Sequence, residues 1–203
     1  MGYVTEWKGS ALKYNAMQRG FDSMMIAQDC AVRPVGRIMR KIQGRAVMTG
    51  LLTELLTPFD VTSIAPAEKP EIKREMIRLV STLHEKYRMA HGDIKPSNFL
   101  RCKDGSLRLC DFDTARLVDD EEADYEGCAT LQFLAPNRHY FATGAPPTAA
   151  DDIYALGLSI WSLFTGKKVL VGVDLEELLQ QRGTVELDEI DDMETRWLVR
   201  ICL

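Results

Sequence analysis

Two short stretches decide how this sequence folds: HGDIKPSN at residues 91–98 and DFD at residues 111–113. The segment between them, residues 99–110, alternates in a way that is typical of two short strands. Its middle carries Asp104-Gly105, the dipeptide most favoured in tight β-turns. Because a tight hairpin returns the chain to its starting point, we expect the two stretches to meet at one edge of a small sheet.

The polar side chains that this hairpin brings together suit phosphate chemistry. Asn98 and Asp111 offer oxygen ligands with no His or Cys required, and Mg²⁺ prefers such ligands while it keeps waters and shares phosphate oxygens. Asp93 is placed to accept a proton from a hydroxyl nucleophile, and Lys95 to set a positive charge beside a transferring phosphate. A single Asp or Asn in a turn is usually a cap, but several matches at fixed spacing favour a site.

The remainder of the chain predicts strands first and helices later. Alternating residues at 33–40 and 45–52 predict two strands joined by a turn at Gln43-Gly44. Apolar residues at helical spacing predict helices at 14–30, from Glu71, at 151–165 with Gly166 as the C-cap, at 174–182 and from Asp191. This order predicts an α+β fold.

Composition sets outer limits on the function. The 203 residues are 46% hydrophobic and 27% charged, an ordinary globular mixture, and 25 basic against 30 acidic residues give a net charge of −5. A mildly acidic chain has no general field for nucleic acid, so no nucleic-acid partner is expected. The longest nearly apolar run, residues 153–164, is too short to span a bilayer, so no membrane association is expected. Five cysteines without a C-x-x-C pair favour an intracellular protein of the cytoplasm or nucleus.

Taken together, the motifs resemble those of a eukaryotic-type protein kinase domain of the Ser/Thr type. Residues 91–98 are similar to the catalytic loop H-R-D-x-K-x-x-N, with Gly92 in place of Arg, and residues 111–113 to the D-F-G motif. TLQFLAPN at 130–137 resembles the end of the activation segment, T-x-x-Y-x-A-P-E, and DIYALG at 152–157 the start of the central buried helix.

The resemblance implies a bilobal fold, with a reduced strand-rich N-lobe and hinge at 1–56 and a mainly helical C-lobe at 57–203. It also gives the impression of a kinase domain trimmed at both ends. The implied reaction is transfer of the ATP γ-phosphoryl group to Ser or Thr hydroxyls of a protein substrate. The implied cofactors are ATP and Mg²⁺.

Individual roles follow from the matched positions. Asp93 would be the catalytic base and Lys95 would steady the γ-phosphate, while Asn98 and Asp111 would hold Mg²⁺ and so help to bind the nucleotide. Residues 53–56 resemble the gatekeeper and hinge, so Glu54 and Leu56 would bind adenine. Residues 11–13 resemble the strand that carries the phosphate-binding lysine, which makes Lys13 the candidate for that role.

Other features depart from the kinase pattern and keep two alternatives open. The chain contains no G-x-G-x-x-G, and no Glu lies between Lys13 and Glu54 to partner that lysine, so Asp22 or Asp29 would have to substitute. Asp113 stands where the family has a Gly with unusual backbone angles. These departures favour a pseudokinase that acts as a scaffold or binding module.

The second alternative is a small-molecule phosphotransferase of the aminoglycoside or choline kinase type, which often carries His-Gly-Asp at this place. The acidic run at 119–126 is either a solvated loop or a surface that attracts basic substrates.

Overall fold

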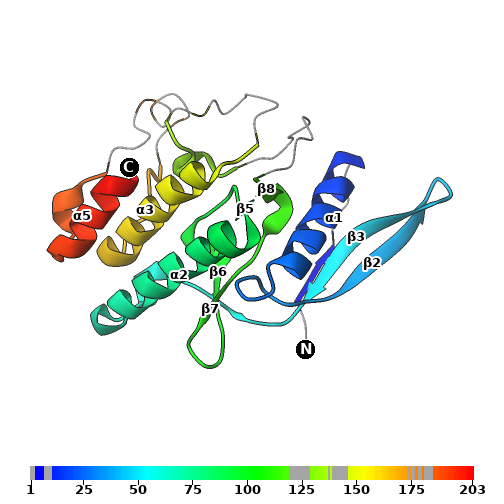
Figure 1. Ribbon diagram of the computed structural model, residues 1–203, viewed down its shortest axis with the longest axis horizontal. Coiled ribbons are helices and arrows are strands. Elements are labelled where there is room, and N and C mark those ends of the chain that lie inside the picture. Colours follow the sequence, from blue (N-terminus) through cyan, green and yellow to red (C-terminus); the bar gives the residue numbers. More distant parts are fainter. Residues whose placement is uncertain are drawn as a thin grey trace.

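The computed structural model describes residues 3–6, 11–118, 129–136, 138, 146–172, 174, 177, 180 and 185–203. Its N-terminal region is a three-stranded antiparallel sheet in the order β1-β3-β2 with one helix beside it (Figure 1). The elements are β1 (Tyr3–Glu6), α1 (Ala11–Ile26), β2 (Pro34–Ile42) and β3 (Arg45–Thr53).

The β2–β3 hairpin confirms the two strands predicted for this region. Its turn residues Gln43 and Gly44 both have positive φ, 48° and 82°. Two consecutive left-handed residues are typical of the turn that matches the twist of paired strands. The register runs from Ile42 opposite Arg45 to Pro34 opposite Thr53, with bulges on the way.

The strand expected at residues 11–13 was wrong, because these residues form the first turn of α1. Ala, Leu and Lys are all strong helix formers, so a triplet of them does not favour a strand. The strand that pairs with β3 lies further upstream as β1, with Val4 opposite Leu52. Lys13 therefore lies on a helix.

The rest of the chain is mainly helical. The helices α2 (Lys69–Tyr87), α3 (Ala149–Thr165) and α5 (Met193–Cys202) lie side by side on the face of the molecule away from β2 and β3 (Figure 1). The short strands and 3₁₀ turns between them are β4 (Thr57–Pro58), η1 (Val61–Ser63), η2 (Pro66–Glu68), β5 (Met89–Ala90), η3 (Pro96–Asn98), β6 (Phe99–Arg101), β7 (Leu107–Leu109), η4 (Phe112–Thr114), β8 (Arg116–Leu117), η5 (Leu131–Phe133) and η6 (Leu187–Glu189).

Four predicted elements of this region are confirmed, and a fifth lies mostly outside the described residues. The helix predicted from Glu71 is α2. β6 and β7 form the hairpin around Asp104-Gly105, with Phe99 opposite Leu109. α3 begins at a capping box of Thr148 and Asp151 and ends at Gly166, whose φ of 69° is left-handed. α5 confirms the last helix, whereas most of the helix expected at 174–182 lies outside the described residues.

The β6–β7 hairpin also joins the two regions of the molecule. Ala31, which follows α1, forms a parallel bridge with Leu109. The Leu109 N–H donates to the Cys30 carbonyl at 2.7 Å, and the Val32 N–H donates to the Leu109 carbonyl at 2.7 Å. Because β7 runs directly into residues 111–113, this bridge fixes the distance between α1 and the DFD stretch.

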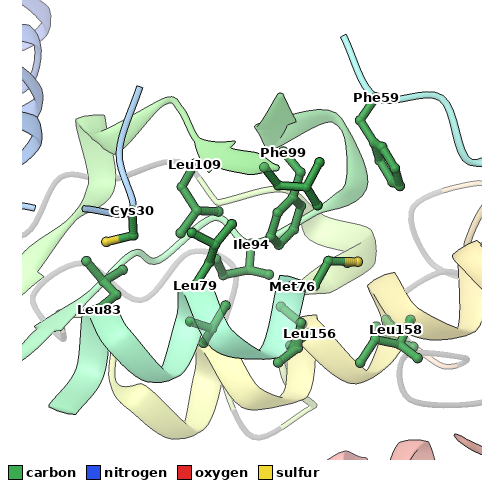
Figure 2. Close-up of a cluster of buried hydrophobic side chains, with 14 of the residues drawn as sticks. Cys30, Phe59, Met76, Leu79, Leu83, Ile94, Phe99, Leu109, Leu156 and Leu158 are labelled. Atoms are coloured by element: carbon green, nitrogen blue, oxygen red, sulfur yellow. The ribbon is translucent and has the colours of Figure 1, made fainter. Parts of the chain in front are cut away.

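A core of hydrophobic side chains lies between α2, α3 and the β6–β7 hairpin. Figure 2 shows Met76, Leu79 and Leu83 of α2 facing Phe99 and Leu109 of the hairpin. All five side chains are fully buried, and each of that size contributes roughly 1.5–3 kcal/mol of transfer free energy. The fold is α+β, with a few strands in the N-terminal region and a mainly helical C-terminal region, as predicted. Within the described residues, no helix is long and apolar enough to cross a membrane.

Candidate active site

The loop at residues 91–98 is anchored to the core by a carboxylate of α3. Asp152 accepts hydrogen bonds from the backbone N–H of His91 at 2.7 Å and of Gly92 at 2.9 Å. The same carboxylate lies 2.9 Å from Nε2 of His84 on α2 and is 1% exposed. Three partners and deep burial fix this carboxylate, and through it the path of the loop that carries Asp93.

His91 is a packing residue of this loop and not a free base. Its Nδ1 lies 3.3 Å from the backbone N–H of Asp93, and its Nε2 lies 3.0 Å from the Cys110 carbonyl. An N–H donor faces Nδ1 and a carbonyl faces Nε2, an arrangement that suits the tautomer with a hydrogen on Nε2. Its ring packs on Phe112 with centroids 4.7 Å apart, which links the loop to the DFD stretch.

Asp93 lies at the centre of a hydrogen-bond network. Lys95 Nζ donates to Asp93 Oδ2 at 2.5 Å and to Thr130 Oγ1 at 2.7 Å. The backbone N–H of Thr130 donates to Asp93 Oδ1 at 2.9 Å, and Asn98 Nδ2 donates to the Asp93 carbonyl at 2.8 Å. The structure thus brings Asp93, Lys95 and Asn98 together as expected, and adds Thr130.

The network holds the Asp93 carboxyl in its ionised form. Burial by itself raises the pKa of this carboxyl, but the hydrogen bond and the charge of Lys95, together with the Thr130 hydrogen bonds, outweigh burial and bring the pKa below the ordinary value of 3.8. At neutral pH Asp93 is therefore a carboxylate able to accept a hydrogen bond from a hydroxyl.

The backbone of the DFD stretch has an unusual conformation at Asp111. Asp111 has φ 63° and ψ 62°, a left-handed conformation that few non-glycine residues adopt. Phe112 and Asp113 then enter a 3₁₀ turn, and Asp113 is not among the residues with positive φ. The unusual backbone angles expected at Asp113 are therefore found two residues earlier, at Asp111, whose side chain is exposed at the cleft.

A cleft of about 390 Å³ opens between α1, β3 and the DFD stretch. Asn98 and Asp111 line one side of the cleft. Glu54 and Leu56, in the segment that joins β3 to β4, also line it. Glu54 Oε1 accepts from the Arg33 N–H at 2.9 Å, which holds this connection against the start of β2. Four of the five predicted nucleotide-site residues thus share one cleft.

Neither aspartate considered as a lysine partner lines this cleft. Asp22 on α1 is exposed and accepts hydrogen bonds from Gln18, and Asp29 forms an ion pair with Lys86 on α2. Among the α1 side chains that the structure describes, Met17 and Met24 line the cleft and contribute an apolar wall.

Comparison with known proteins identifies the family to which this geometry belongs. The family model for the protein kinase domain matches residues 42–197. The chain belongs to the protein kinase domain family. The matched region covers the cleft residues from β3 onward, the loop that carries Asp93, and α3 with its anchoring Asp152.

Curated relatives of this kinase domain are Ser/Thr and dual-specificity kinases. The chain is 28% identical over 165 residues to a probable serine/threonine-protein kinase PknB of Corynebacterium glutamicum, covering 79% of this chain and 24% of that protein. It is 32% identical over 90 residues to the dual specificity mitogen-activated protein kinase kinase jkk-1 of Caenorhabditis elegans, covering 44% and 21%. It is 33% identical over 98 residues to the serine/threonine-protein kinase AtPK1/AtPK6 of Arabidopsis thaliana, covering 48% and 20%. The chain therefore spans about a fifth to a quarter of the length of these relatives.

The oxygen atoms of this kinase domain fit a magnesium ion. Asn98 donates through its amide nitrogen to Asp93, which leaves its Oδ1 as an acceptor beside the cleft. Asp111 is exposed at the same cleft, with no hydrogen bond or ion pair to the described residues. Two hard oxygen ligands suit Mg²⁺ that shares phosphate oxygens, and the described residues hold no cluster of three or more His, Cys, Asp or Glu.

Sequence reasoning missed two residues of this site. Thr130 was part of the quoted TLQFLAPN stretch, but it lies 37 residues from Asp93 and 35 from Lys95 in sequence, so no local pattern predicts its contacts with them. Gly20 on α1 was not singled out at all, although its Cα faces Asp113 and Phe112. The signal at Thr130 was its place at the start of a recognisable motif, whereas Gly20 carried none.

Proposed function

We propose that this kinase domain transfers the γ-phosphoryl group of ATP to a Ser or Thr hydroxyl of a protein substrate. The observation that supports this most directly is the network of Asp93, Lys95, Asn98 and Thr130, because it joins an ionised carboxylate and an ammonium to Asn98, which lines the cleft. A scaffold has no chemical need for Asp93, Lys95, Asn98 and Asp111 together.

In the proposed step, the substrate hydroxyl donates a hydrogen bond to Asp93 and its oxygen attacks the γ-phosphorus. The new O–P bond forms as the bond to the β-phosphate oxygen breaks, ADP leaves, and the hydroxyl proton passes to Asp93. Lys95 stabilises the negative charge on the γ-phosphoryl oxygens. Thr130 holds Lys95 and Asp93 in position through its hydrogen bonds to both.

The nucleotide would occupy the cleft lined by Glu54, Leu56, Asn98 and Asp111. Glu54 and Leu56 would meet adenine, while Asn98 and Asp111 would hold Mg²⁺, which neutralises charge on the phosphates when bound. That Lys13 contacts the phosphates remains a prediction, from the first turn of a helix and not from a strand. We also propose that the boundary between the two lobes lies at residues 56 and 57.

The test is transfer of labelled phosphate from Mg-ATP to a mixed Ser/Thr peptide pool, with Asp93→Asn beside the wild type. Asparagine keeps an acceptor oxygen for the Thr130 N–H but removes the charge and the proton acceptor. Asp104→Asn, in the β6–β7 turn, is the matched control, because it makes the same chemical change away from the cleft. We expect transfer by the wild type and by Asp104→Asn only, with ATP affinity similar in all three. Equal transfer by Asp93→Asn would contradict the role of Asp93.

A nucleotide-binding module without transfer is a second candidate, favoured by the apolar wall that α1 presents to the cleft. ATP binding by the wild type without transfer to any peptide would support it. The small-molecule alternative is tested in the same assay, since choline or an aminoglycoside would then be labelled while peptides are not. The match to the protein kinase domain family and to Ser/Thr kinases favours a protein substrate.

A further inference from the structure

A second hollow opens beside the network, on the side away from the nucleotide cleft. It has a volume of about 430 Å³, and Ser97 lines both hollows. Lys95 and Thr130 form the end that is shared with the network, and the apolar wall comes from Phe59, Val61, Phe133 and Val169. We call this hollow the lysine groove, because Lys95, Lys167 and Lys168 all line it.

The charges of the lysine groove are unequal. Among the described residues, its lining has three lysines and a single carboxylate, Asp60. Asp60 already acts as a cap: it accepts from Thr62 N at 3.0 Å and Thr62 Oγ1 at 2.9 Å, and these bonds lower its pKa. Asp60 therefore stays an ionised carboxylate, outnumbered by the lysines of the described lining.

The ammonium groups differ in how far they are already compensated. Lys95 bonds to Asp93, and Lys167 Nζ lies 2.6 Å from Glu189. Lys168 is exposed and forms no ion pair within 4.0 Å with any described residue, although its charge helps to lower the pKa of Asp60, after the hydrogen bonds from Thr62. A like-charged ligand would be repelled at this point, and an acidic one would be attracted.

The groove also contains an unsatisfied polar group. Ser162 of α3 lines it, is 2% exposed, and its hydroxyl has no hydrogen-bond partner. Unpartnered buried hydroxyls are uncommon because they cost free energy, and a polar ligand in the groove would satisfy this one. Ser162 thus indicates a polar occupant, and the lysines set the sign of its charge.

We infer that the lysine groove receives a carboxylate-rich segment of the protein substrate, next to the hydroxyl that is phosphorylated. This inference rests on the proposed function, since it assigns a substrate class to the same site. It is opposite to the basic substrates that the acidic run at 119–126 would attract, and that run lies outside the described residues.

Peptide binding without ATP tests the inference separately from catalysis. Four fluorescent peptides of equal length would share one central Ser and carry flanking Glu, Gln, Lys or phosphoserine. We expect the Glu peptide to bind about 10-fold or more tighter than the Lys peptide, and to weaken as salt is raised. Equal binding, tighter binding of the Lys peptide, no binding of the Glu peptide, or binding of the phosphoserine peptide alone would overturn the inference. Failure of phosphate transfer, measured apart, would count only against the proposed function.

Two variants locate the binding surface. Lys168→Glu should weaken the Glu peptide by about 3–10-fold and strengthen the Lys peptide, whereas Lys103→Glu, an exposed reversal in the β6–β7 turn, should change neither. Ser162→Ala should weaken the Glu peptide while the unfolding midpoint stays the same or rises, because it removes an unsatisfied hydroxyl. An unchanged Glu-peptide affinity in Lys168→Glu would show that the peptide binds elsewhere.

Discussion

Gly20 on α1 faces Asp113 so closely that a Cβ at position 20 would overlap Asp113 Oδ1 and lie 3.3 Å from the backbone of Phe112 and Asp113. The absence of a side chain at Gly20 thus leaves room for the Asp113 carboxylate. Asp113 stands where the kinase family has a glycine, and α1 has a glycine, Gly20, at the point of contact. This pairing lets α1 pack on η4 without moving the DFD stretch away from the cleft.

This relationship predicts a coupled pair of substitutions. Gly20→Ala forces the crowded contact, which costs roughly 1–3 kcal/mol, and recovers up to about 1 kcal/mol of helix propensity. We expect a net loss in the free energy of unfolding, measured by urea denaturation. In an Asp113→Gly background the carboxylate is gone, so the same substitution should be neutral or stabilising. Additive effects of the two changes would contradict the packing described here.

Gly92 predicts a second loss that depends on its surroundings. Its φ is 80°, and an added Cβ would lie 2.8 Å from Pro147 Cγ and 3.2 Å from Thr114 Cβ. Gly105 has a similar φ of 88° but nothing within 4 Å. Both alanine variants bear the left-handed strain of roughly 1–2 kcal/mol, and Gly92→Ala adds overpacking of about 1–3 kcal/mol. Urea denaturation should therefore rank Gly92→Ala well below Gly105→Ala, and an equal loss would show that the contact with Pro147 relaxes freely.

Asp152 predicts the largest loss of stability in the site. Asp152→Ala leaves the backbone N–H groups of His91 and Gly92 without their acceptor in a buried place. We expect a loss of about 3 kcal/mol or more in the free energy of unfolding. The neighbouring Asp151→Ala removes a helix cap and an ion pair with Arg138 at 3.7 Å, and should cost about 1–2 kcal/mol. Similar losses for the two would argue against Asp152 as the anchor of the loop.

Much of the fold was predictable because its signals are local. The Asp104-Gly105 turn, the Gln43-Gly44 turn and the Gly166 cap each follow from the backbone angles that their own residues favour. The convergence of Asp93, Asn98 and Asp111 was predictable because one hairpin connects them. Contacts between distant segments were not predictable in this way. Three features depend on how separate segments pack, and no short sequence pattern encodes them. They are the contact of Gly20 with Asp113, the hydrogen bonds of Thr130, and the lack of an ion pair between Lys168 and the described residues.

The strand expected at 11–13 is a case in which resemblance to the family gave the wrong prediction. Its residues have no strong preference for a strand, and only the resemblance to a kinase pattern suggested one. The structure supplies β1 as the partner of β3 and begins a helix at Ala11. At these residues, helix propensity predicts the structure better than the resemblance to the kinase family does.

Burial predicts an order of cysteine reactivity. Burial is the main cause that raises the pKa of the Cys110 thiol to about 12 and of the Cys30 thiol to about 11. At pH 8 the Cys110 thiolate fraction is then about one in ten thousand. Iodoacetamide followed by peptide mass spectrometry should label Cys102, in the β6–β7 turn, well before Cys30 and Cys110 in the folded chain. Loss of this order in urea is the control, and rapid labelling of native Cys110 would show that the cleft opens.

Asp93 predicts how acid affects the folded chain. Its pKa is lowered in the folded state, so its carboxylate contributes stability that is fully present above the unfolded pKa of about 3.9 and is lost as pH falls through the folded value. Urea denaturation of the wild type and of Asp93→Asn between pH 3 and pH 7 should therefore show the two curves converging in acid. Lys95→Met removes the ammonium that holds the carboxylate ionised, so the pKa of Asp93 should rise and the acid loss should begin at higher pH. Asp104 gives the comparison, since hydrogen bonds from Ser106 lower its pKa but Lys95 does not contact it. An acid profile that Lys95→Met leaves unchanged would mean that Thr130 alone keeps Asp93 ionised.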